Sequence, residues 1–121
     1  MNNPYNFISR LISEYKLSQG DPELCASITS NSVSSVALRD ILLEIGDVLD
    51  EDLENSAYIA TVKTGLFNIA SSVVGAMVCD KTVYIVCIAH EGLLQQNLSI
   101  KTVTRLAERF KNAEVHYETH G

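Results

Sequence analysis

Apolar residues recur at intervals of three and four in three segments of the chain, which predict three amphipathic helices. The first helix is expected over residues 4–18, where Asn3 can cap it and Gly20-Asp21-Pro22 ends it. A second helix is expected over residues 35–51. A third, capped by Ser99, is expected over residues 100–111.

The helix expected over residues 35–51 carries two apolar stripes. The main stripe consists of Leu38, Ile41, Leu42, Ile45, Val48 and Leu49. At 100° per residue these positions fall within about 120° of arc, while Val36 and Leu43 lie on the far side. A surface helix of a monomer seldom needs a second apolar stripe, and Gly46 permits close approach of a neighbour. We therefore expect a homodimer whose interface includes Val36, Leu43, Gly46 and Asp47.

Shorter apolar runs between the helices predict strands. Residues 24–29 indicate a short strand before a turn region, Ser30–Ser35, and residues 57–64 indicate another. After a loop near Asn68–Ser72, the runs 73–79 and 82–89 flank Asp80-Lys81 and predict a hairpin. Both faces of this hairpin are apolar, which is typical of a sheet covered on both sides. We therefore expect buried side chains at Val78, Ile85, Val86 and Ile88.

The predicted fold is a single α+β domain over residues 1–121. Its antiparallel sheet is covered by helices on both faces. The expected order is a helix, a short strand region, a helix, a three-strand meander, a helix and a short C-terminal strand, which is the alternating tail from Glu114 to His120. The strand 57–64 is expected to have an exposed edge, which offers a second route to association.

Composition and charge exclude several classes of protein. The chain has 121 residues, is 46% hydrophobic and carries a net charge of −6, so it lacks the clustered cations of a nucleic-acid groove. The chain has three cysteines, Cys25, Cys79 and Cys87. Their odd number and the absence of a CxxC pair argue against a disulfide framework and a zinc ribbon. Their apolar neighbours indicate that they are buried as small hydrophobic residues. No run of residues resembles a signal peptide or a membrane span. We expect a cytoplasmic protein.

Few residues offer chemistry. Along the tail, two imidazoles and two carboxylates share one face, so they either bind a divalent metal or form a solvated surface with Val115 and Tyr117 turned inward. These four are Glu114, His116, Glu118 and His120. The terminal position favours the solvated surface. Cys87 and His90 point to opposite sides of a strand, so they do not form a nucleophile pair. With no phosphate loop or catalytic motif, we expect no enzyme, cofactor or metal site.

Charged residues form two runs of opposite sign. An acidic run spans residues 47–54, and Lys101, Arg105 and Arg109 make a basic stripe at i, i+4 spacing. Such runs are usually solvated faces, and they can also steer a charged partner protein toward its binding site.

The segment Val83-Tyr-Ile-Val-Cys-Ile-Ala-His-Glu-Gly-Leu-Leu-Gln-Gln-Asn-Leu resembles the last strand and the start of the closing helix in the Roadblock/dynein-light-chain family. The order of elements over residues 4–111 is similar too. This resemblance implies a homodimeric scaffold that engages a small GTPase or a motor or transport complex. Two departures stand out: the first hairpin would have to turn at Asn31-Ser32, and a strand at 114–119 is extra.

A second segment is similar to another family. Gly75-Ala-Met-Val-Cys-Asp-Lys-Thr-Val-Tyr-Ile-Val resembles the first hairpin of bacterial PH-like (GRAM-related) domains, which implies binding of a lipid or a peptide. That alternative would make residues 100–111 a strand, and it needs further elements after residue 119. A small acidic inhibitor or immunity protein that blocks an effector is a third possibility. The function expected first is a non-enzymatic protein-interaction module.

Overall fold

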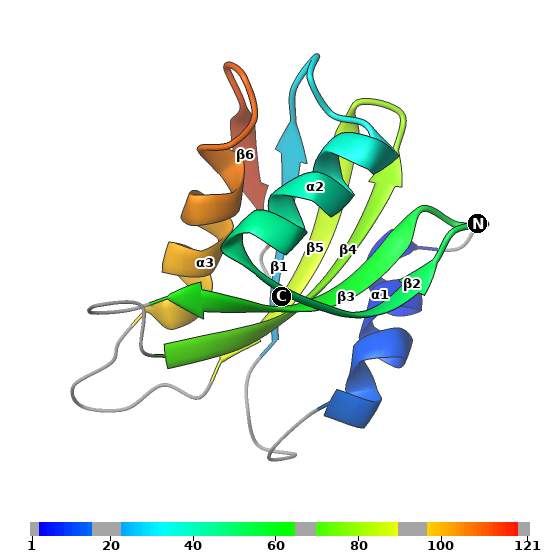
Figure 1. Ribbon diagram of the computed structural model, residues 1–121, viewed down its shortest axis with the longest axis vertical. Coiled ribbons are helices and arrows are strands. Elements are labelled where there is room, and N and C mark those ends of the chain that lie inside the picture. The colour runs from blue at the N-terminus through cyan, green and yellow to red at the C-terminus, as the bar shows by residue number, and fades with distance from the viewer. Residues whose placement is uncertain (1–2, 16–22, 65–69, 90–96, 119–121) are drawn as a thin grey trace.

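The computed structural model describes residues 3–15, 23–64, 70–89 and 97–118. In chain order its elements are α1 (Pro4–Ile12), a 3-10 turn (Ser13–Tyr15), β1 (Glu23–Thr29), α2 (Ser35–Ile45), β2 (Gly46–Asp52), β3 (Ala57–Thr64), β4 (Ala70–Cys79), β5 (Thr82–Ala89), α3 (Leu98–Ala107) and β6 (Glu114–Tyr117). Figure 1 shows their arrangement. The predicted α+β class and antiparallel sheet are confirmed.

One six-stranded sheet runs through the molecule in the order β2-β3-β4-β5-β1-β6. Strands β2 to β5 form a four-strand meander, one strand more than the sequence predicts, and β1 lies between β5 and β6. The hairpin predicted around Asp80-Lys81 is confirmed, with Cys79 opposite Thr82 and a left-handed backbone at Asp80 (φ 59°). Because β3 pairs with both β2 and β4, the expected exposed edge at 57–64 is wrong.

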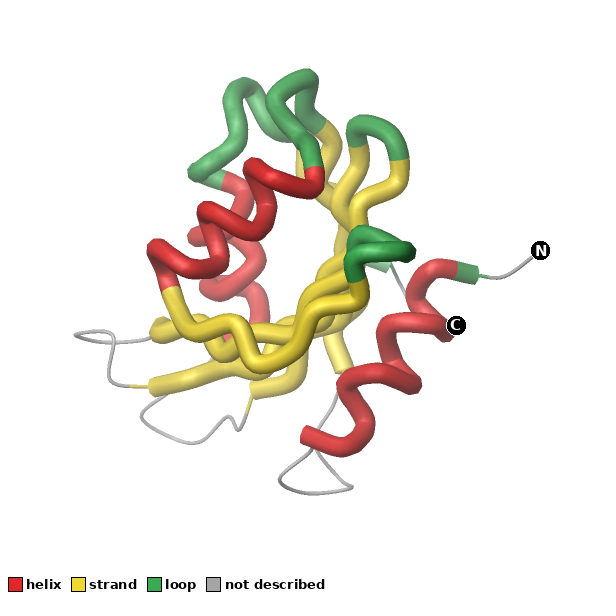
Figure 2. The backbone as a smooth tube through the Cα atoms, turned by 45° about the vertical axis from the view of Figure 1, so that its right-hand side comes forward, coloured by secondary structure: helices red, strands yellow, loops and turns green. Residues whose placement is uncertain are grey.

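The sheet contributes side chains to two separate hydrophobic clusters. In the larger one, side chains of α2 and α3 pack on the sheet, with fully buried Leu42, Ile85 and Leu106 among them. In the smaller one, Ile8 and Ile12 of α1 pack against residues of β1 and β5. Figure 2 shows α1 on one side of the sheet and α2 and α3 on the other.

Burial along β4 and β5 differs from the prediction at one position. Ile85, Val86 and Ile88 are buried as expected. Val78 is only half-buried, because it lies near the end of β4, next to the turn, and packs at the margin of the larger cluster. Cys25 and Cys87 are buried, whereas Cys79, the last residue of β4, is half-buried.

The first helix begins where the sequence predicts. The Asn3 side chain accepts a hydrogen bond from the backbone N–H of Tyr5 (2.9 Å), and Pro4 occupies the first turn. The regular helix ends at Ile12, and the remainder of the expected 4–18 helix beyond Tyr15, with Gly20-Asp21-Pro22, lies outside the described residues.

The helix expected over residues 35–51 is wrong in its second half. α2 ends at Ile45, the N–H of Gly46 donates to the Leu42 carbonyl, and the chain continues as β2. Gly46 lies so close to β3 that a Cβ atom there would be 1.8 Å from the Thr61 carbonyl oxygen. Glycine at this position therefore allows the chain to leave the helix and pair at once with β3.

The remaining boundaries differ by a few residues. α3 spans Leu98–Ala107 with Asn97, rather than Ser99, as its first flanking residue. Ser99 is a buried residue inside the helix. The expected loop near 68–72 is partly strand, because β4 begins at Ala70. The C-terminal strand is confirmed as an edge strand paired with β1. In the described part of the chain, no helix is long and apolar enough to cross a membrane.

Tyr5 gives the fold a dependence on alkaline pH. Burial raises the pKa of its phenol to about 12. Its ring packs edge-on against the ring of Tyr84, with the two ring centroids 5.5 Å apart. In the unfolded chain the phenol ionises near its ordinary pKa of 10.0, so the folded state retains the proton between these values. We expect stability to fall as the pH rises from about 10 to about 12, a loss that Tyr5→Phe reduces in urea titrations.

Candidate functional site

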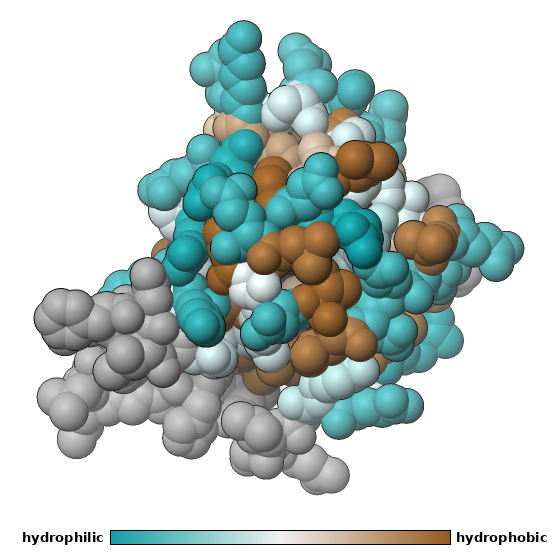
Figure 3. Space-filling view, viewed as in Figure 1, coloured by the Kyte–Doolittle hydropathy of each residue, from teal (hydrophilic) through white to brown (hydrophobic). Residues whose placement is uncertain are grey.

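Exposed apolar side chains gather around α2 and β2. Seven large hydrophobic residues are exposed in the described part of the chain, and four lie here: Val36 (70%), Leu43 (48%), Leu49 (44%) and Leu53 (70%). They come from α2, from β2 and from the turn after β2. Figure 3 shows apolar surface over this region, bordered by hydrophilic residues. Leu43 and Leu49 line one depression. Exposed apolar side chains with a polar rim are typical of an interaction site.

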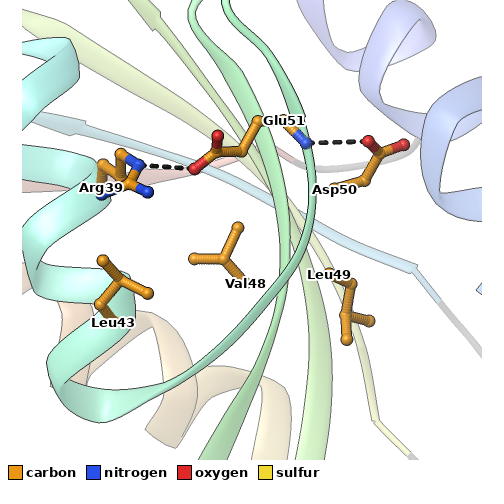
Figure 4. A pocket seen from close by; sticks show the side chains of 6 residues that line it. All are labelled: Arg39, Leu43, Val48, Leu49, Asp50 and Glu51. Carbon is orange, nitrogen blue, oxygen red and sulfur yellow. Dashed lines mark hydrogen bonds and ion pairs between the residues drawn. The ribbon is translucent and has the colours of Figure 1, made fainter.

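An open depression of about 480 Å³ separates α2 from β2. Its lining consists of Arg39, Leu43, Val48, Leu49, Asp50 and Glu51. Figure 4 shows Leu43 and Val48 on its two sides, with the Arg39 guanidinium reaching across to Glu51. The Arg39 Nε–Glu51 Oε1 distance is 2.6 Å. This exposed ion pair joins helix and strand beside Leu43 and Val48, and it fixes geometry more than it adds stability.

β2 is also an edge of the sheet. It is the terminal strand in the sheet order, so one side of its backbone has no strand neighbour among the described residues. Its register against β3 shifts between Val48 and Asp50, which leaves Leu49 as the extra residue of a β-bulge. Beyond the bulge the Asp50 side chain accepts a hydrogen bond from the backbone N–H of Glu51 at 2.9 Å.

Three of the four residues expected in an interface are exposed in the structure. Val36 and Leu43 are exposed on α2, and Asp47 is exposed on β2. Gly46 serves a different purpose, because its close neighbour is Thr61 of the same chain. The homodimer itself stays a prediction.

The basic stripe on α3 is partly engaged within the chain. Arg105 donates to the backbone carbonyl of Lys63 (2.6 Å), and Arg109 forms an ion pair with Glu44 of α2 (2.5 Å). Lys101 is exposed. Two of the three cations therefore tie α3 to neighbouring elements, whereas the acidic run lies on β2 and the turn after it.

A second, smaller apolar surface lies between α3 and β6. Its lining includes Thr104, Ala107, Glu108, Phe110, Ala113, Val115 and Tyr117. Val115 and Tyr117 were expected to turn inward, yet they are 38% and 36% exposed. Through their pairing with Ile28 and Ala26 they share the α3 face of the sheet, but α3 does not cover them fully, because β6 is the outermost strand.

The candidate chemistry of the tail gains no support. Glu114, His116 and Glu118 are exposed along β6, and the His116 Nε2–Glu118 Oε1 distance is 3.7 Å. No three His, Cys, Asp or Glu residues within the described ranges are placed to hold a metal ion. His120 lies outside these ranges, as does His90 of the Cys87–His90 pair. Burial and the nearby Glu23 and Glu118 carboxylates raise the pKa of Cys25, which leaves its thiol protonated and unreactive.

Sequence reasoning missed β2 and the contact between Arg39 and Glu51. The helical spacing of apolar residues continues through Val48 and Leu49, and this coincidence extended the predicted helix. Two signals indicated that the helix ends earlier: Gly46, a residue typical of helix ends, and the acidic residues that follow it, which do not stabilise the last turn of a helix. Acidic side chains are unfavourable at the C-terminal end of a helix because of the helix dipole.

Comparison with known proteins finds no family model that matches this chain. Neither a curated protein nor a solved structure is significantly similar to it. The Roadblock-like and PH-like resemblances therefore stay predictions. Where the Roadblock-like fold needs a hairpin, Asn31-Ser32 form a turn before α2. Residues 100–107 of the segment that a PH-like domain would make a strand lie in α3.

Proposed function

We propose that this protein is a non-enzymatic protein-interaction module that binds its partner through the surface formed by α2 and β2. The observation that carries the proposal is the group of exposed apolar side chains at Val36, Leu43, Leu49 and Leu53, next to the free edge of a sheet. Hydrophobic anchors surrounded by charged residues provide affinity at protein interfaces, and an unpaired strand adds main-chain hydrogen bonds.

Affinity capture from the native host with three baits, the unmodified chain and two variants, tests this proposal. Leu43→Asp places a charge in the centre of the surface, and we expect it to abolish capture of the specific partner. Ile100→Asp is the matched control, because Ile100 on α3 is 45% exposed, close to the 48% of Leu43. This control is expected to retain the partner, and circular dichroism checks that both variants are folded. Identical capture by all three baits, or turnover of a small-molecule substrate, contradicts the proposal.

Self-association is a separate prediction with its own measurement. If a second copy covers Val36 and Leu43, sedimentation equilibrium at high micromolar concentration detects twice the chain mass of 13.3 kDa. Leu43→Asp then gives the monomer. Because Leu43 is 48% exposed in a single chain, we expect this monomer to stay folded. A 13.3 kDa species for the unmodified protein refutes the homodimer and leaves the interaction module intact.

A further inference from the structure

We infer that the partner segment is an extended strand with alternating basic and apolar residues, which adds to the free edge of β2. This inference rests on the proposed function and specifies the chemistry of the partner. It follows from the position of β2 in the sheet and from the sides on which its charged and apolar residues lie.

The edge offered by β2 is long enough to take a strand. It spans seven residues, against four for β6 at the opposite edge of the sheet. The main chain of an added peptide bonds to such an edge, while its alternate side chains contact the two faces of the sheet. The two faces at β2 differ in character, so they specify what those side chains are.

One face of the edge is acidic. Asp47, Asp50 and Asp52 lie opposite Thr61, Ile59 and Ala57 of β3, and side chains opposite one another share a face. This is the α1 side of the sheet, where Leu11 lies near Asp50 and Asp52. Figure 4 accordingly shows Asp50 across β2 from Arg39. Asp47 shares a small pocket with Lys63 and Arg105. Asp50 and Asp52 line a separate pocket whose lining includes no lysine or arginine, so they carry most of the acidic character of this edge.

The other face of the edge is apolar at its centre. Val48 and Glu51 lie opposite Ala60 and Tyr58 on the α2 side, where Leu43 forms the far wall of the depression. Arg39 already pairs with Glu51, so the charge on this side is balanced within the chain. A strand added to β2 thus places its basic residues beside these aspartates, above all Asp50 and Asp52, and its apolar residues toward Leu43 and Val48.

A second copy of the chain does not fit this edge. Two β2 strands paired about a two-fold axis would bring aspartates of one chain opposite those of the other, and like charges directly opposite are destabilising. Each chain also has a net charge of −6. Carboxylates and a bulge on an edge strand disfavour pairing between two copies of the same sheet. They still allow a basic segment to pair with the edge.

The test uses a fluorescently labelled seven-residue peptide in which lysine and valine alternate, titrated with the full chain and followed by anisotropy and by NMR shifts of β2 amides. We expect a dissociation constant on the order of 0.1 mM at low salt, weakening as salt is added. Asp47→Asn/Asp50→Asn should bind about tenfold more weakly, because two opposite-charge pairs are lost. The matched control, Glu114→Gln/Glu118→Gln, makes the same change in net charge at the other edge and should bind as the unmodified chain does.

Two comparison peptides separate strand addition from charge attraction. A peptide with the lysines and valines in separate blocks, and one N-methylated at alternate residues, are both expected to bind at least tenfold more weakly. Any of three results overturns the inference: equal binding of all three peptides, NMR shifts confined to residues outside β2, or no binding at about 1 mM peptide. A dimer that buries Leu43 also overturns it while the interaction module stands. If Leu43→Asp and Ile100→Asp capture the partner equally well, that result instead contradicts the proposed function.

Discussion

Ile85→Ala is expected to destabilise the protein by about 4 kcal/mol, toward the upper end of the range for a buried aliphatic residue. Ile85 lies on a central strand with none of its surface exposed. Its neighbours on the two adjoining strands are Ala26 and Ala76. Alanine side chains cannot extend into the space that the lost methyl and methylene groups leave, so a cavity remains.

Urea unfolding followed by circular dichroism measures this loss. Val36→Ala serves as the control, because Val36 is 70% exposed, and its effect should stay within about 0.5 kcal/mol. A change below about 1 kcal/mol for Ile85→Ala would mean that this face of the sheet is open to solvent, contrary to the larger hydrophobic cluster in the structure.

Gly46→Ala is expected to cost about 3 kcal/mol, the upper part of the usual range for overpacking. The backbone of Gly46 is extended (φ −169°), so its conformation suits any residue and the requirement is one of space. The nearest atoms to an added Cβ are the Thr61 carbonyl oxygen at 1.8 Å and carbon at 2.8 Å. Main-chain atoms in a paired strand cannot rotate away, so β2 must separate from β3 at this point.

Hydrogen exchange of the β2 amides, together with urea unfolding, detects this separation. Gly75→Ala is the comparison, because its added Cβ meets the Ile8 Cγ2 methyl at 2.3 Å. A side chain at the helix–sheet contact can shift, so we expect a smaller loss of about 1–2 kcal/mol. If Gly46→Ala proves the milder of the two, the close contact between Gly46 and Thr61 does not hold in solution.

Much of the fold was predictable because its signals are local. The cap at Asn3, the strand Ala57–Thr64 and the turn at Asp80-Lys81 each depend on residues near one another in the chain. The apolar pattern of residues 82–89 likewise predicted burial at Ile85, Val86 and Ile88. These features needed no knowledge of distant neighbours.

The candidate site was predictable only in part. The far-side stripe on the second helix correctly marked Val36 and Leu43 as exposed apolar positions, whereas Asp47, also exposed, lies on the other face of β2. The sequence predicts the exposed sheet edge at residues 57–64 instead of β2, because the helix it predicts over 35–51 covers nearly all of β2. The depression and the Arg39–Glu51 pair depend on that strand, so they were out of reach.

The sequence by itself determined where chain segments become regular and which of their side chains are apolar, because local backbone preference and hydrophobic spacing act over a few residues. Only the tertiary structure decided that the chain leaves its second helix at Gly46, where the Thr61 carbonyl excludes a side chain. It also decided that β6 pairs with β1 and that β2 becomes the free edge. Such pairings join residues far apart in the chain, and their stability comes from contacts that no local pattern records.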